Sequence, residues 1–238
     1  MLHHALDLES ITLPAAPAWP APLSLAVALD EVVLIEGVEP ALAEPLLEVV
    51  ATLRSPVTGK VRHWGLDAET LFREDLYQLR GRIAYISPRQ VLLSHLSLGE
   101  NIALVPCYRL GCSETEALAP YADLLEHLKL RAHLDQLPAQ VSAAVYSRAV
   151  WARELLKEPG LILAVLTGFQ AAAGAQLLLT VLEEYLPRYS AAAVLLGESL
   201  EPYYPLGHRL LALEAGQLLK KPLLDHRARP LTAHLPLV

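Results

Sequence analysis

Glu31-Val32-Val33-Leu34-Ile35-Glu36-Gly37 predicts a buried strand that ends at a glycine, and residues 40–53 after it predict a helix. Apolar residues in succession are typical of a parallel strand that is covered on both faces. Pro40 suits the first position of a helix, and Pro45 lies near enough to the same end to be tolerated. This strand–glycine–helix unit indicates an α/β fold, in which strands and helices alternate along the chain.

The same alternation continues on both sides of this unit. We expect further sheet strands at residues 83–87, 161–166 and 192–196, and helices at residues 142–157 and 172–186. Strands separated by helices imply a mainly parallel sheet with helices on its flanks. The remaining strands are expected at residues 5–13, 23–27, 60–64, 210–213 and 217–219.

A block that is mostly helical by its pattern interrupts the strands at residues 88–158. Ser113 and Glu116 have the spacing of a capping box, and Ser142 is placed to cap the helix that follows. We therefore expect one domain over residues 1–238. Its parts are an α/β core at residues 1–87 and 159–220, a helical subdomain at residues 88–158, and a C-terminal tail at residues 221–238.

The composition excludes several classes of protein. Hydrophobic residues make up 53% of the 238 residues, which excludes a disordered chain. A formal net charge of -7 gives no basic footprint for nucleic acid or for an anionic membrane surface. Residues 160–182 carry no charge, but glycines and glutamines interrupt them, which favours a strand followed by a helix over a membrane span.

Residue types that often carry chemistry lack a motif in this chain. Cys107 and Cys112 are too few for a disulfide framework and form no C-x-x-C, so a reducing cytoplasm is the simplest setting. Trp19 is expected to pack within a loop, whereas Tyr203 and Tyr204 suit a contact surface and core packing equally well. The histidines show no metal-ligand spacing, and we expect no metal site from His3, His4, His63, His95, His127, His133, His208, His226 or His234.

Five regions, in their order and at their distances, resemble the ATP-binding cassette of ABC transporters. They correspond to the strand before the family's phosphate-binding loop, the turn after its first helix, the Q-loop region, the end of the signature helix and the closing hairpin. They lie at residues 31–35, 53–61, 82–102, 152–159 and 208–218. The resemblance implies a P-loop-NTPase-like cassette: a mainly parallel sheet core with flanking helices, an antiparallel β part and an inserted helical subdomain.

The positions that correspond to the family's Walker A motif have lost the groups that bind phosphate. A phosphate-binding loop needs glycines with free N–H groups, a lysine, and a hydroxyl for Mg²⁺. Gly37 is retained, but Ala43 stands at the lysine position and Glu44 at the hydroxyl position. Glu39 adds a second carboxylate near the helix start, where it would repel a phosphate.

The other motifs of the family are also lost. Val165 and Leu166 replace the Walker B carboxylates, which hold Mg²⁺ and polarise the attacking water. Pro88 stands at the Q-loop glutamine, and Glu198 at the switch histidine. In the signature motif only Ser142 keeps its residue type; a helix N-cap is favoured for it over contact with a partner's nucleotide.

These departures predict a pseudo-ATPase: a non-catalytic, structural or regulatory subunit of an ABC-type transporter, on the cytoplasmic face of a membrane permease. We expect no ATP or Mg²⁺ as cofactor and no nucleic acid; an active cassette subunit or a second copy would be a further partner. In the family, the region of residues 89–101 contacts the permease. Four leucines there either line a partner groove or are buried in the helical subdomain: Leu92, Leu93, Leu96 and Leu98.

Two alternatives stay open. One is an ABC transporter ATP-binding protein with residual ATP binding or hydrolysis, which would use ATP and Mg²⁺. The other is a soluble scaffold that has the cassette fold and no permease. The transported substrate and the direction of transport cannot be inferred from these residues.

Overall fold

The centre of the molecule is a six-stranded sheet with the order β10-β9-β3-β8-β7-β6. The computed structural model describes residues 4–14, 22–38, 40–166, 174–214 and 217–223. All neighbouring pairs in this sheet are parallel except β10 and β9, which form an antiparallel pair at one edge. The strands are β3 (Val32–Glu36), β6 (Ile83–Ile86), β7 (Leu161–Val165), β8 (Ala192–Leu196), β9 (Arg209–Glu214) and β10 (Gln217–Lys221). The predicted mainly parallel sheet is therefore confirmed.

The two faces of this sheet belong to separate hydrophobic clusters, because side chains alternate along each strand. Val33 and Ile35 face the cluster that contains α1 (Pro40–Val50). Val32 and Leu34 face the other cluster, with α6 (Ala143–Leu155) and α7 (Ala175–Tyr189). This explains why β3, β7 and β8 are continuous apolar runs: both of their faces are covered.

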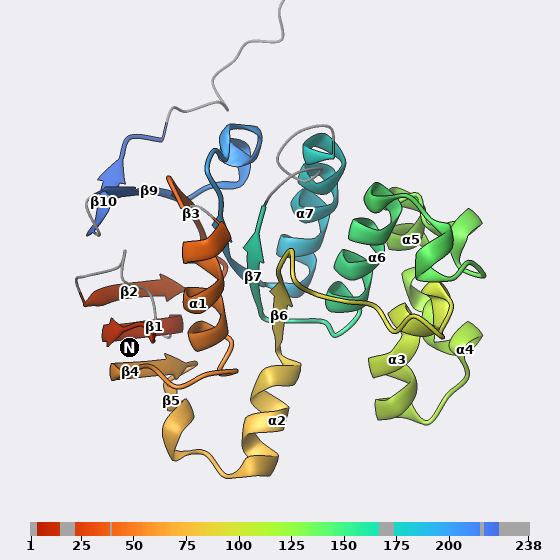
Figure 1. Cartoon of the computed structure of the whole chain (residues 1–238), viewed down its shortest axis with the longest axis horizontal. Coiled ribbons are helices and arrows are strands. Elements are labelled where there is room, and N and C mark those ends of the chain that lie inside the picture. The colour runs from red at the N-terminus through yellow and green to blue at the C-terminus, as the bar shows by residue number, and fades with distance from the viewer. Residues whose placement is uncertain (1–3, 15–21, 39, 167–173, 215–216, 224–238) are drawn as a thin grey trace, which may run out of the picture.

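A second, antiparallel sheet packs over α1, so that α1 lies between the two sheets (Figure 1). Its order is β2-β1-β4-β5. Its strands are β1 (His4–Thr12), β2 (Leu23–Ala28), β4 (Thr58–His63) and β5 (Leu66–Asp67). A 3₁₀ turn, η1 (Ala68–Thr70), and a helix, α2 (Arg73–Gly81), connect it to the central sheet.

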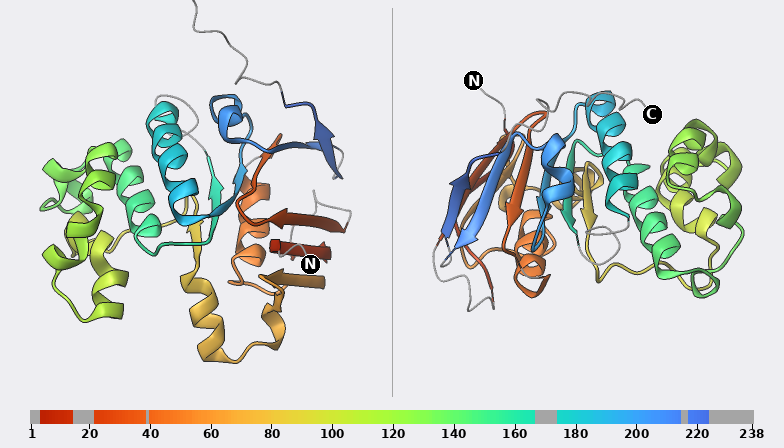
Figure 2. Two further views of the ribbon diagram at one scale, coloured as in Figure 1. Left: turned by 180° about the vertical axis from the view of Figure 1, so that it is seen from behind. Right: turned by 90° about the horizontal axis from the view of Figure 1, so that it is seen from above.

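The helical subdomain lies on the side of the central sheet opposite the antiparallel sheet, as both views in Figure 2 show. The pattern over residues 98–137 predicts a mostly helical segment, and the structure forms it from several short helical elements. Gly111 ends α3 in the left-handed conformation, and the capping box of Ser113 and Glu116 starts α4. The elements before α6 are α3 (Leu98–Leu110), α4 (Glu114–Leu118), η2 (Ala119–Tyr121), α5 (Ala122–His127), η3 (Arg131–His133) and η4 (Pro138–Gln140).

Two other predicted helices keep their place with shifted ends. The helix after β3 ends at Val50, before the predicted residue 53. The described part of α7 runs on to Tyr189, where Ser190 in the left-handed conformation closes it. Between α7 and β9, η5 (Glu201–Leu206) leads the chain back to the sheet. None of the helices in the described ranges combines the length and the apolar character that crossing a membrane requires.

Candidate functional site

The first N–H groups of the loop after β3 form hydrogen bonds within the protein. The Gly37 N–H donates to the Glu198 carbonyl at 3.3 Å, and the Val38 N–H donates to the Gly197 carbonyl at 3.2 Å. Gly37 has φ +73°, and a Cβ there would lie 3.2 Å from the Leu213 carbonyl oxygen, so the position favours glycine. Both N–H groups are therefore bonded to the loop after β8. Glu39, the second carboxylate expected near this helix, lies outside the described residues.

Glu44, in α1, is a buried carboxylate held by hydroxyl groups of β6 and the residue after it. Only 3% of Glu44 is exposed, and it accepts hydrogen bonds from the Tyr85 hydroxyl at 3.0 Å and from the Ser87 hydroxyl. Burial, together with the nearby Glu44 carboxylate, raises the pKa of Tyr85 to about 12, which keeps the phenol protonated as a donor. Ala43 beside it is fully buried in the apolar cluster around α1.

The end of β7 is apolar, and its side chains are buried on both faces of the sheet. Val165 and Leu166 are 2% and 1% exposed and belong to opposite clusters, one on each face of the sheet. The Leu166 N–H donates to the Leu196 carbonyl at 2.8 Å, which continues the pairing with β8. Neither side chain can ligate a metal or accept a proton.

The segment after β8 is packed against the end of β3. A Cβ on Gly197 would lie 3.1 Å from the Leu166 carbonyl oxygen, so this loop also needs glycine for a close approach. Glu198 is exposed, and its backbone carbonyl accepts the hydrogen bond from the Gly37 N–H. The Glu36 carboxylate accepts from the Leu200 N–H at 2.7 Å and from the Tyr204 hydroxyl at 2.9 Å.

The aromatic pair in η5 is therefore tied to the core. Tyr203 is fully buried, and Tyr204 is partly buried with its hydroxyl on Glu36. Of the two roles considered for this segment, core packing is the one that Tyr203 adopts.

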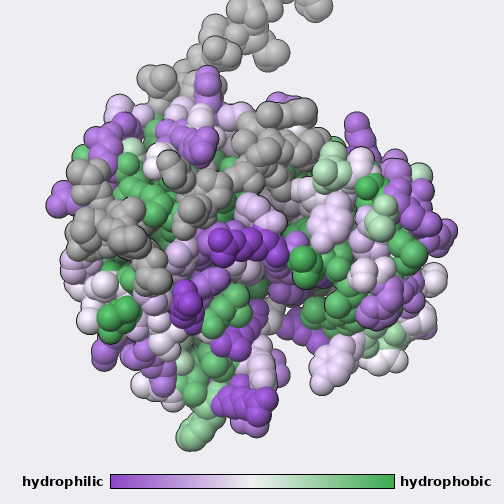
Figure 3. All heavy atoms as spheres, in the orientation of Figure 1, coloured by the Kyte–Doolittle hydropathy of each residue, from purple (hydrophilic) through white to green (hydrophobic). Residues whose placement is uncertain are grey.

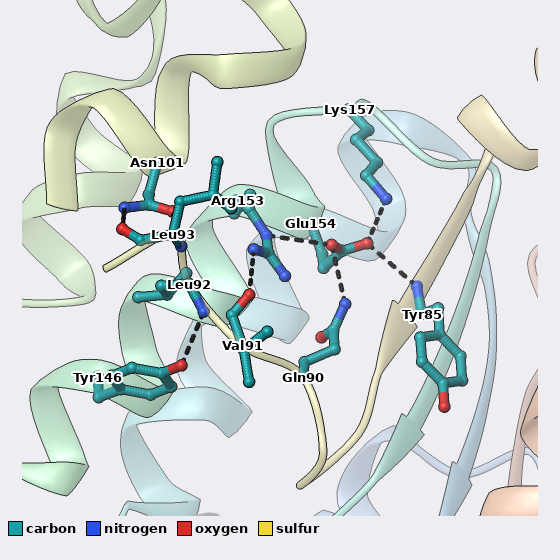
Figure 4. A network of polar contacts seen from close by, with 10 residues as sticks. All are labelled: Tyr85, Gln90, Val91, Leu92, Leu93, Asn101, Tyr146, Arg153, Glu154 and Lys157. Atoms are coloured by element: carbon teal, nitrogen blue, oxygen red, sulfur yellow. Dashed lines mark hydrogen bonds and ion pairs between the residues drawn. The ribbon is translucent and has the colours of Figure 1, made fainter. Parts of the chain in front are cut away.

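The loop after β6 is fastened by a buried carboxylate on α6 (Figure 4). Glu154 is 2% exposed and accepts from the Tyr85 N–H at 3.2 Å and from the Gln90 side-chain amide at 3.1 Å. It also forms ion pairs with Lys157 and with Arg153, the latter at 3.5 Å. Gln90 thus reaches α6, whereas Pro88, at the Q-loop glutamine position, is exposed. Glu154 was not among the predicted site residues. Arg153 precedes it and Leu155 follows it, so the local sequence gives no sign that its carboxylate is buried.

Hydrogen bonds to side chains of α3 and α6 hold the rest of this loop (Figure 4). Arg153 donates to the Val91 carbonyl at 2.8 Å, and the Leu92 N–H donates to the Tyr146 hydroxyl at 2.7 Å. The fully buried Asn101 accepts from the Leu93 N–H at 2.7 Å. Its amide group donates to the carbonyls of residues 93, 96 and 97. Side chains from α3 and α6 therefore fix the path of the loop.

The structure divides the four leucines for which a partner groove was considered. Leu92 and Leu98 are 5% and 0% exposed, because they pack in the hydrophobic cluster of the helical subdomain. For these two the partner-binding interpretation is wrong. Leu93 is 41% exposed, and Leu96 is partly exposed.

The remaining candidates are Ser142, the two cysteines, the histidines and Trp19. Ser142 is exposed and caps α6, accepting from the Val145 N–H at 3.3 Å. Cys107 and Cys112 are partly buried free thiols, and burial raises the pKa of Cys107. Within the described ranges, no group of three or more histidine, cysteine, aspartate or glutamate side chains is placed to hold a metal ion. Trp19 lies outside the described residues.

Similar proteins are ATP-binding proteins of transport systems, although no protein-family model matches the chain. The chain is 32% identical over 143 residues to the macrolide export ATP-binding/permease protein MacB of Salmonella typhi, covering 60% of this chain and 22% of that protein. It is 29% identical over 136 residues to the arginine transport ATP-binding protein ArtP of Escherichia coli K12, covering 56% of each. It is 32% identical over 143 residues to the lipoprotein-releasing system ATP-binding protein LolD of Shewanella denitrificans, covering 60% of this chain and 61% of that protein. The aligned region is thus less than two thirds of each relative.

Solved structures confirm the fold. The ATP-binding cassette MJ0796, in a dimeric post-hydrolysis state with ADP and Pi, superimposes with a TM-score of 0.77 at 19% identity, covering 92% of this chain and 98% of that one. An ATP-binding subunit of an ABC transporter gives a TM-score of 0.76 at 21% identity, covering 94% and 92%. The chain has the fold of an ATP-binding cassette, and its relatives are ATP-binding proteins of this kind.

Proposed function

We propose that this cassette is a non-catalytic subunit of an ABC-type transporter and acts on the cytoplasmic face of a membrane permease. The observation that carries the proposal is Glu44. A buried carboxylate, held by the hydroxyls of Tyr85 and Ser87, stands where the family has the hydroxyl that binds Mg²⁺. Among the described residues no lysine, arginine or histidine pairs with it. A phosphate at this helix start would meet a negative charge where it needs a positive one.

Among the described residues, the positions that correspond to the family's hydrolytic groups hold other side chains. Phosphoryl transfer depends on a cation that neutralises the developing charge and on a residue that orients the attacking water. Ala43, Val165 and Leu166 are buried apolar side chains at the positions of the lysine and of the two Walker B carboxylates. Removing one transition-state donor costs on the order of 3 kcal/mol, and here all of these groups are replaced together.

The relatives support a role in transport. MacB, ArtP and LolD are named as ATP-binding proteins of export, transport or release systems, and MacB as a permease as well. The permease would be a separate integral membrane protein. A second copy or an active cassette subunit would complete a dimer, with Ser142 at the helix start that would face the partner.

An equilibrium binding experiment with radiolabelled ATP and Mg²⁺ tests the non-catalytic role, with LolD of Shewanella denitrificans as the positive control. We expect no binding up to millimolar ATP and no phosphate release. Micromolar binding that is lost in Gly37→Val would contradict the proposal and favour residual ATP binding, the reading that the names of the relatives suggest. Sedimentation with and without ATP adds a second test, because association driven by ATP would also contradict it.

Purification of the tagged chain from detergent-solubilised membranes tests the transporter role. We expect an integral membrane permease to be recovered with it. Recovery without any integral membrane protein would instead favour the soluble scaffold.

A further inference from the structure

A small cavity lies where the helical subdomain meets α7 of the core, two parts that Figure 2 shows side by side. Its volume is about 50 Å³, and it opens to solvent. A water molecule needs roughly 10–15 Å³ of such space, so the cavity has room for about four waters or for one small organic group. The residues that line it come from η2, α5 and α7, and none of them stands at a position of the family's nucleotide-binding motifs.

Three of the nine tyrosines of the chain line this cavity. The rings of Tyr185 and Tyr189 are stacked with their centroids 4.4 Å apart, and Tyr121 lines the cavity from the helical subdomain. The Tyr185 hydroxyl donates to the Leu155 carbonyl at 2.9 Å, which fixes its ring. On the face drawn in Figure 3, hydrophobic and hydrophilic residues are interspersed over both parts of the molecule. The gathering of tyrosines in the cavity is therefore a local feature.

The charged groups around the cavity are mostly acidic. Asp123 and Glu184 line it, and the Glu158 carboxylate accepts from the Tyr121 hydroxyl at 2.9 Å. Burial, and after it the Glu158 carboxylate, raise the pKa of Tyr189, so the negative charge of Glu158 is felt at the aromatic wall. Among the described residues, no lysine or arginine lies within 4.0 Å of any of these three carboxylates.

Two basic side chains also line the cavity. His127 Nδ1 lies 3.1 Å from a carboxylate oxygen of Glu184, and this contact joins α5 to α7. The Arg188 guanidinium lies over the ring of Tyr189, 5.5 Å from its centroid. A cation on this ring shows which sign of charge the aromatic wall attracts. Arg188 is itself exposed, so a cation that enters from solvent competes with a mobile side chain and not with a buried one.

We propose that this cavity binds a small free compound with a quaternary ammonium group, which packs against Tyr121, Tyr185 and Tyr189. Aromatic rings recognise such groups because the cation is attracted to the ring faces. The surrounding carboxylates add to this attraction, and a trimethylammonium group is of the size that the cavity takes. The bound group would contact both the subdomain and α7, and would hold them together. The inference goes beyond the proposed subunit role and does not rest on it.

Titration of the isotope-labelled full chain with choline, followed by NMR, tests this site. We expect saturable shifts in the millimolar range at backbone amides of residues 119–127 and 175–189. Dimethylbutanol, the neutral isostere in which carbon replaces the nitrogen of choline, is the matched control ligand. It should bind about tenfold more weakly, because it has the shape of choline without the charge.

Variants locate the binding. Y121A and Y189A should each weaken choline about tenfold, and R188Q should strengthen it about threefold because the competing cation is gone. The control Y77A, at an exposed tyrosine of α2 outside the cavity, should change nothing. If the tyrosine variants fail to fold by circular dichroism, E184Q takes their place, since Glu184 is exposed; it should weaken choline and leave dimethylbutanol unchanged.

Three results would overturn the inference. They are the absence of saturable shifts, equal affinities for choline and dimethylbutanol, and choline binding that the cavity variants leave unchanged. Flotation with phosphatidylcholine vesicles covers the other source of this group, and we expect the chain to stay unbound. Vesicle binding that Y121A and Y189A abolish would assign the cavity to a lipid surface and overturn the proposal of a free ligand. No nucleotide and no permease enters these experiments, so failure here is distinct from failure of the proposed function.

Discussion

Replacing Glu154 by glutamine should destabilise the protein strongly while keeping the shape of the side chain. Each carboxylate oxygen of Glu154 faces two nitrogen groups. Oε1 accepts from Gln90 and forms an ion pair with Arg153, and Oε2 accepts from the Tyr85 N–H and from Lys157. Whichever oxygen becomes an NH₂ group, two donors lose their acceptor and face another donor. The buried carboxylate at the centre of this network is thereby removed.

The expected cost follows from these contacts. Removing one member of a fully buried ion pair costs about 3–5 kcal/mol, and a hydrogen bond to a charged group contributes about 1.5–3 kcal/mol. The side chains of Arg153 and Lys157 are 14% and 17% exposed, so water compensates part of the loss. We therefore expect E154Q to lower the free energy of unfolding by about 3 kcal/mol.

Urea unfolding at equilibrium, with the midpoint and the m-value fitted together, measures this difference. Glu126→Gln is the matched control, because Glu126 pairs with Arg131 at 3.7 Å and both side chains are about two thirds exposed. The control should change stability by less than about 0.5 kcal/mol. A loss of less than about 1 kcal/mol in E154Q would show that the network does not hold the loop to the core.

Three further predictions concern single side chains. Burial lowers the pKa of His63 to about 4 from 6.5, so the unfolded chain binds a proton that the native state lacks. Stability should then fall by about 3 kcal/mol between neutral pH and pH 4, and H63L should remove this component from urea unfolding measured across that range. L92A should cost about 2–4 kcal/mol and L93A less than about 1 kcal/mol, since only Leu92 is buried; equal losses in urea would contradict their placement. S142A should cost about 1 kcal/mol through the lost N-cap, and S142D should restore it, as thermal unfolding can check.

The central strands could be predicted because their burial is reflected in unbroken runs of apolar residues in the sequence. In β3, β7 and β8 nearly every residue is buried, so an unbroken apolar run marks the strand without any tertiary information. The caps of α4 and α6 were equally readable, since Ser113 and Ser142 act on residues three positions away.

The helix α2 could not be predicted from its pattern. Leu79 is its buried residue, and the other side chains of Arg73–Gly81 are partly or fully exposed, so no apolar periodicity develops. Nothing in the chain near residue 44 shows that its partners would be Tyr85 and Ser87, which are 41 and 43 residues away. The positions that correspond to the family's motifs followed from their order in the chain, but their hydrogen bonds depend on how the elements pack.

The fastened loop after β6 also has a mechanical consequence. It connects the sheet that carries α2 to the subdomain that begins with α3, and Tyr146, Arg153, Glu154 and Asn101 fix it along its length. A force applied to either lobe would therefore move both lobes together as one rigid body. A partner bound to one lobe would thereby displace the other lobe as well, so these contacts suit the molecule to transmit a displacement from one lobe to the other.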